Sequence, residues 1–86
     1  MTNEVYQKSL EYRLRTFGKR YYLFAPHGKN YEVNEVGKMV WENINGEKKL
    51  SEIISEVINT YDVDENIAQA DVKHFVKGLQ KVGAIL

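Results

Sequence analysis

The chain has 86 residues, and its twelve basic and twelve acidic side chains leave a formal net charge of zero. With 43% hydrophobic and 28% charged residues, it has the composition of one small globular domain, which leaves little room for a deep, enclosed active site. It has no cysteine and no apolar run near the ~20 residues of a membrane span, which excludes disulfides, thiolate metal sites and membrane insertion and favours a cytoplasmic protein.

The first elements expected along the chain are β-strands. Residues 1–10 are expected to be a flexible N-terminus, and from Tyr12 apolar or aromatic residues alternate with polar ones, the period of a strand. The alternation predicts strands over residues 12–17, 20–25 and 29–33, with turns at Gly18 and at Pro26-His27-Gly28. Short connections of this kind predict a three-stranded antiparallel meander.

After the strands, apolar residues recur at helical spacing. Asn34 is a suitable N-cap for a first helix that Gly46 can close. The second helix has the clearest pattern, from Leu50 to Tyr61, and Asp64 can cap a third helix that ends at Gly83. Three strands followed by three helices predict a single α+β domain over residues 1–86, resembling a winged helix-turn-helix.

No residue pattern in the chain predicts catalysis. The two histidines, His27 and His74, have no metal-binding spacing, and no glycine-rich phosphate loop exists. The carboxylates of the first two helices fall on outward faces, which is typical of a solvated surface. We therefore expect no enzyme activity, no metal and no cofactor.

Two features favour binding instead. If strand order follows the chain, the strand over residues 29–33 has one unpaired edge, which can accept an added strand from a peptide. On the third helix, Lys73, Lys77 and Lys81 recur every four residues opposite the core. This row is either a solubilising face or a functional one.

An ordered series of short segments extends over roughly residues 12–86. The segments are Arg13, Tyr22-Leu23-Phe24, Tyr31-Glu32-Val33-Asn34, Val36-Gly37, Val40-Trp41-Glu42, Ile44-Asn45-Gly46, Leu50-Ser51-Glu52-Ile53-Ile54, Tyr61-Asp62-Val63, Asp71-Val72, Phe75-Val76, Leu79 and Gly83-Ala84-Ile85-Leu86. In this series the chain resembles the PqqD-like family, the small peptide-recognition elements of ribosomal peptide-modification pathways. It departs from the family pattern at Lys49, where a Thr N-cap is frequent, and at Val33, where Leu is frequent.

The resemblance implies a winged helix-turn-helix domain that does no chemistry and binds the leader segment of a precursor peptide. The leader adds a strand beside the third strand and lies in a groove between this strand and the third helix. Carried onto this chain, the peptide-binding residues are Asn30, Tyr31, Glu32 and Val33 on the strand, with Val72, Lys73 and Val76 near the rim on the helix. Phe75 and Leu79 are interpreted as core rather than groove floor.

The resemblance also implies that the leader is delivered to a partner, a modifying enzyme or a leader peptidase. Lasso peptide biosynthesis is favoured on overall similarity, over the pathway of a quinone cofactor in which a radical enzyme receives the precursor. The acidic face of the first two helices, with Glu42, Glu52 and Glu56, is a candidate partner contact. The open strand edge allows a monomer or an edge-paired homodimer.

The rival hypothesis is a DNA-binding winged-helix regulator. Residues 34–66 hold three basic and eight acidic side chains, whereas proteins that bind nucleic acid through phosphates need a broad basic face. The outer face of the second helix presents Glu52 and Glu56, which would repel phosphates. We therefore expect no nucleic-acid partner.

Overall fold

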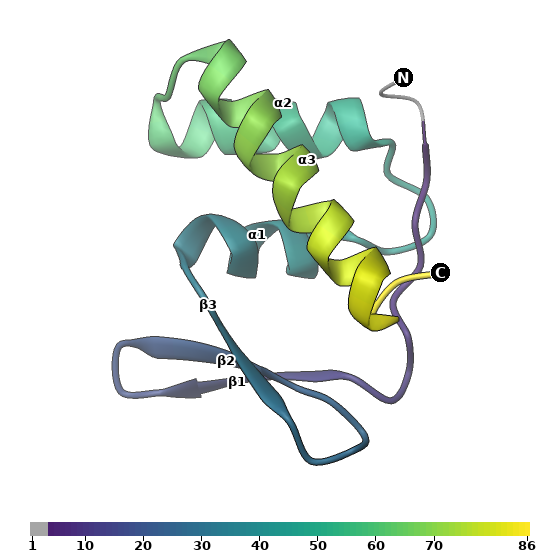
Figure 1. Cartoon of the computed structure of the whole chain (residues 1–86). Helices are drawn as coiled ribbons and strands as arrows, with labels where there is room; N and C mark the ends of the chain where they lie inside the picture. The colour runs from purple at the N-terminus through teal and green to yellow at the C-terminus, as the bar shows by residue number, and fades with distance from the viewer. Residues whose placement is uncertain (1–3) are drawn as a thin grey trace.

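Three antiparallel strands precede three helices in the computed structural model, which describes residues 4–86 (Figure 1). The elements are β1 (Arg13–Phe17), β2 (Arg20–Phe24), β3 (Asn30–Val33), α1 (Glu35–Asn43), α2 (Leu50–Tyr61) and α3 (Glu65–Val82). The sheet has the order β1-β2-β3, and the helices lie together on one side of it (Figure 1). The predicted α+β fold is confirmed.

The sheet register divides the strand side chains between two faces. Antiparallel pairing places Leu23 opposite Tyr31 and Tyr21 opposite Val33, and paired residues share a face. Leu23 is 2% exposed, and Tyr31 and Val33 pack against the core. These residues form the inner face toward the helices, so the alternate residues of each strand form an outer face.

Side-chain caps begin two of the helices as predicted. The Asn34 Oδ1 accepts a hydrogen bond from the Gly37 amide at 2.8 Å, which starts α1. The Asp64 Oδ2 accepts from the amides of Asn66 and Ile67 at 3.1 and 3.4 Å, which starts α3. Both carboxamide and carboxylate therefore satisfy amides that have no partner inside the helix.

The ends of α2 and α3 agree with the sequence prediction, whereas the end of α1 does not. Asp62 and Gly83 take left-handed backbone conformations, with φ of 52° and 83°, and end α2 and α3. Helix α1 ends at Asn43, before the predicted Gly46. Gly46 instead lies in the following loop with a φ of 80°, where its amide donates to the Tyr6 carbonyl at 3.0 Å.

The core lies between the inner face of the sheet and the three helices. It is built from the following buried residues: Tyr12, Leu23, Ala25, Val40, Trp41, Ile44, Leu50, Ile53, Ile54, Val57, Ala68, Val72, Val76, Leu79, Ala84 and Ile85. None of the helices within residues 4–86 combines the length and apolar character needed to cross a membrane.

Residues 4–9 form an N-terminal strap along the helices. The Glu4 carbonyl accepts a hydrogen bond from the Leu50 amide at 2.9 Å. The Gln7 carbonyl accepts one from the Leu86 amide at 2.9 Å, and the Ser9 amide donates one to the Ala84 carbonyl at 2.8 Å. This part of the segment expected to be flexible is therefore held in place. Residues 1–3, which belonged to the same expectation, lie outside the described residues.

Candidate functional site

The open edge of β3 is defined by the hydrogen-bonding pattern of the sheet. The Ala25 amide donates to the Lys29 carbonyl at 2.9 Å, and bonded pairs alternate along an antiparallel ladder. The pairs Leu23–Tyr31 and Tyr21–Val33 are therefore the bonded ones. It follows that the backbone groups of Asn30 and Glu32 face the open edge, whereas those of Tyr31 and Val33 face β2.

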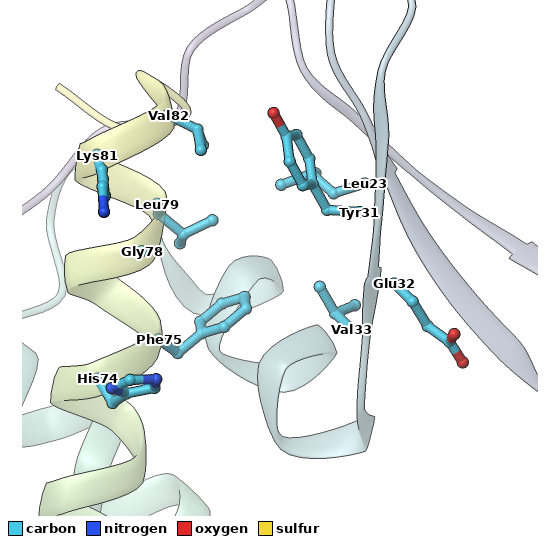
Figure 2. Close-up of a pocket in the computed structure, with 10 residues that line it drawn as sticks. All are labelled: Leu23, Tyr31, Glu32, Val33, His74, Phe75, Gly78, Leu79, Lys81 and Val82. Carbon is cyan, nitrogen blue, oxygen red and sulfur yellow. The ribbon is translucent and has the colours of Figure 1, made fainter.

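A cavity of about 320 Å³ lies directly beside this edge, between β3 and α3 (Figure 2). Its lining residues come from the end of β2, from β3 and from one flank of α3: Leu23, Tyr31, Glu32, Val33, His74, Phe75, Gly78, Leu79, Lys81 and Val82. Figure 2 shows the Tyr31 ring and the Val33 side chain pointing from β3 toward Phe75, Leu79 and Val82 of α3. We call this cavity and the adjoining β3 edge the β3/α3 groove.

The groove has an apolar floor and a polar rim. Leu79 is 4% exposed and belongs to the core, as interpreted from the sequence, although it also forms part of the floor. Phe75 is only half-buried and lines the groove, so its interpretation as a core residue is corrected. The Glu32 carboxylate points away from the cavity (Figure 2), so Glu32 contributes mainly its backbone.

The placement of Val72 and Val76 differs from the prediction. They are 0% and 3% exposed and pack in the core, and neither lines the groove. The reason is helical geometry, because residues 68, 72, 76 and 79 form the buried stripe of α3. Strand β3 instead meets the neighbouring flank of α3.

Lys73 also lies outside the groove. Together with Lys77 it borders a separate hollow, of about 200 Å³, beside Glu4, Tyr6 and Leu50. The lysine row therefore divides between two flanks of α3, and Lys81 is its member at the groove. The helical wall of the groove includes His74, Gly78 and Val82, which the sequence prediction did not name.

A second hollow of about 200 Å³ extends the groove toward the start of α1. It shares His74 and Phe75 with the main cavity and adds Asn34, Val36, Gly37 and Asp71. At Gly37 a Cβ would lie 2.9 Å from Cε1 of Phe75, so the glycine allows the ring to pack against α1. The two hollows therefore adjoin each other at His74 and Phe75.

The opposite end of the groove is fixed by Tyr12. Its hydroxyl donates a hydrogen bond to the Val82 carbonyl at 2.5 Å, which ties the segment before β1 to the end of α3. Because Val82 also lines the cavity, this bond holds the helical wall at a set distance from the sheet. The bond therefore braces this end of the groove.

No group of three or more His, Asp or Glu side chains within residues 4–86 is placed to hold a metal ion. His74 stands at the rim of the groove, while His27 lies in the exposed turn before β3. The arrangement offers backbone pairing and apolar contact, which are the requirements of peptide recognition.

Comparison with known protein families gives a match over most of the chain. A family model described as coenzyme PQQ synthesis protein D (PqqD) matches residues 20–85. The match includes β2, β3 and all three helices, and therefore the whole groove. A search among curated protein sequences finds no match.

Three solved structures share the fold. The PqqD truncation of Methylobacterium extorquens PqqCD, a stand-alone recognition element for ribosomally synthesised and post-translationally modified peptides, has a TM-score of 0.84 and 23% identity, covering 100% of this chain and 93% of that one. Lasso peptide synthetase B1 complexed with the leader peptide has a TM-score of 0.81 and 14% identity, and the match covers 96% of this chain and 99% of that one. TbiB1 in complex with the TbiA(beta) leader peptide has a TM-score of 0.77 and 19% identity, and the match covers 92% of this chain and 93% of that one.

Proposed function

The chain belongs to the PqqD family, and from this premise we propose that it is a non-catalytic recognition element for the leader segment of a ribosomally made precursor peptide. The observation that carries the proposal is the open edge of β3 beside an apolar groove. Two structures of the same fold are complexes with leader peptides. The leader would add a fourth strand beside β3 and place side chains in the groove.

The chemistry of the groove supports this mode of binding. The outward backbone groups of Asn30 and Glu32 supply donors and acceptors that pair with an extended peptide whatever its sequence. The apolar side chains of Tyr31, Phe75 and Leu79 select for apolar leader residues. Because a free leader is disordered, binding has to overcome its ordering entropy and stays reversible, which suits a protein that passes its ligand on.

The recipient is a modifying enzyme or a leader peptidase, and we favour the lasso type, in line with the likeness to lasso peptide synthetase B1. A precursor is captured where it is synthesised, so we place this function in the cytoplasm. The free chain is a monomer or an edge-paired homodimer. In the second case the leader would displace the partner copy, because both use the same β3 backbone groups.

DNA binding is less well supported by the surface of α2. The Glu52 carboxylate accepts a hydrogen bond from the Lys49 amide at 2.8 Å, and the Glu56 carboxylate lies 3.8 Å from the Lys48 ammonium. Both acidic groups stand where a recognition helix would need donors for bases and phosphates. We therefore do not propose a DNA-binding function.

A pair of proline variants tests strand addition. Glu32→Pro removes an amide that faces the open edge of β3, and Thr16→Pro removes the equivalent outward amide on the other edge strand, β1. Proline is tolerated at such edge positions. We expect Glu32→Pro to weaken binding of the leader peptide encoded beside this gene by about tenfold or more, since one backbone bond and the close approach of the strand are lost.

Thr16→Pro should bind the leader like the wild type, and calorimetric titration measures both variants. Circular dichroism verifies that each remains folded. Unchanged leader affinity in folded Glu32→Pro would show that the β3 edge is not the docking strand.

A further inference from the structure

The outer face of the sheet carries a cluster of aromatic rings. The ring centroid of Phe17 lies 6.0 Å from that of Tyr22 and 6.0 Å from that of Phe24. The ring centroids of Tyr22 and Phe24 are 6.5 Å apart. Phe17 is 58% exposed. A sheet with one solvated face normally places polar residues on that side, so an aromatic cluster there indicates a surface that meets a partner.

Three arginines surround the cluster. Arg13 pairs with Phe24, Arg15 with Tyr22, and Arg20 with Phe17, so all three share the outer face with the rings. All three arginines are exposed. Among the strand residues of this face, Glu32 is the acidic one, which leaves the face with an excess of positive charge.

Arg20 links the rings to the edge strand. A side-chain hydrogen bond with Tyr22 and the negative charge of Glu32 raise the pKa of Arg20 above its ordinary value. The sheet register pairs Tyr22 with Glu32, and Arg20 lies two residues before Tyr22 on the same face of β2, so the three side chains are neighbours across β2 and β3. The outer face is thus a contiguous surface of aromatic and cationic groups, which we call the Arg/aromatic face.

We propose that the Arg/aromatic face docks an acidic surface patch of the enzyme that receives the precursor. The identity of this partner rests on the proposed function. Arginine and aromatic residues are enriched at protein interfaces and supply most of their binding energy. An acidic partner surface complements the guanidinium groups, and the rings supply the apolar centre of the contact.

The position of the face supports simultaneous binding. It belongs mainly to β1 and β2 and points away from the helices, whereas the leader would occupy the β3 edge and the groove on the inner side (Figure 1). Enzyme and leader can then be held by one chain at the same time. Holding both raises the effective concentration of the precursor at the enzyme.

The acidic face of α1 and α2 is a weaker candidate for this contact. The Glu42 carboxylate lies 3.0 Å from the Lys38 ammonium, and Glu56 faces Lys48. Glu52 accepts the hydrogen bond that begins α2. These carboxylates are already engaged within the chain, whereas Arg13 and Arg15 are paired across the sheet with Phe24 and Tyr22 of β2.

Two other occupants fit the Arg/aromatic face less well. In a symmetric contact between two copies of the chain the same patch meets itself, which would bring arginines against arginines. Single-stranded nucleic acid stacks its bases on exposed ring faces, but here the rings meet edge to face, at 62° and 72°. Glu32 would in addition repel phosphates.

The test uses Arg15→Glu and Phe17→Ser, with Lys77→Glu as the control for a matched charge reversal on α3. Affinity is measured by biolayer interferometry for the purified precursor-processing enzyme encoded beside this gene, and by fluorescence anisotropy for the leader peptide. We expect both outer-face variants to lose about tenfold or more in enzyme affinity. Leader affinity should stay within about twofold of the wild type because the groove lies elsewhere.

Lys77→Glu should bind the enzyme like the wild type, and wild-type affinity for the enzyme should fall as salt is raised. The docking proposal is overturned if wild type binds no enzyme, if both outer-face variants bind it normally, or if the face binds single-stranded RNA instead. In any of these cases normal leader binding leaves the proposed function intact. Enzyme docking through the Arg/aromatic face without any leader binding would overturn the proposed function instead.

Discussion

At the scale of single residues, Gly78 shows how the groove is kept open. It lies in the middle of α3 and lines the cavity, and a Cβ added there would meet no other atom within 4 Å. A glycine inside a helix costs about 1 kcal/mol relative to alanine. No close contact requires this glycine, so we infer that the absence of a side chain at Gly78 leaves space in the groove beside β3.

Substitutions at Gly78 should separate stability from binding. Gly78→Ala should raise the free energy of unfolding by about 1 kcal/mol, because alanine is the better helix former. Gly78→Leu should also remain folded but weaken leader binding by about tenfold or more, because its side chain enters the groove that the peptide needs. Thermal denaturation and peptide titration measure the two effects, and normal leader affinity in Gly78→Leu would contradict this role of the glycine.

At the scale of elements, α2 begins with an incomplete cap. The Glu52 carboxylate accepts from the Lys49 amide at 2.8 Å, but the Lys49 side chain has no oxygen to accept from the first turn. This arrangement is half of a capping box. Helix α2 therefore depends on burial of Leu50, Ile53, Ile54 and Val57 for most of its stability.

Lys49→Thr should complete the capping box. The threonine hydroxyl can accept from the amide of Glu52, so we expect the free energy of unfolding to rise by about 0.5–1 kcal/mol. Urea denaturation measures the change, with Lys49→Ala as the control for loss of the lysine alone. An increase of the same size in Lys49→Ala would exclude capping as the cause.

At the scale of the whole molecule, the N-terminal strap joins parts of the chain that are distant in sequence. It bonds to the loop before α2 and to the C-terminal residues, through isolated bridges between Val5 and Lys49 and between Lys8 and Ile85. The strap also borders the hollow with Lys73 and Lys77, on the flank of α3 that does not meet β3. It therefore braces the domain from outside the groove.

Removal of residues 1–8 should destabilise the domain without closing the groove. It deletes the hydrogen bonds to the amides of Gly46, Leu50 and Leu86, so we expect the free energy of unfolding to fall by about 2–3 kcal/mol. Affinity for the leader should be retained below the unfolding temperature. Urea denaturation and peptide titration measure both quantities, and an unchanged urea midpoint would contradict the bracing role.

The sequence by itself determined the elements, because their signals are local. Alternation over residues 12–33, the caps Asn34 and Asp64, and the helical spacing after Leu50 each depend on neighbours within about one turn or one strand pair. Strand order followed from the short connections, and so did the open edge of β3. These signals were enough for the fold and for the open strand edge.

Only the tertiary structure decided which flank of α3 faces β3. Lys73 and Phe75 lie on opposite sides of the buried stripe that contains Val72 and Val76. Sequence spacing treats the two flanks alike. The packing of α3 across α1 and α2 chooses between them, because it turns Phe75 and Gly78 toward the sheet and leaves Lys73 on the other side.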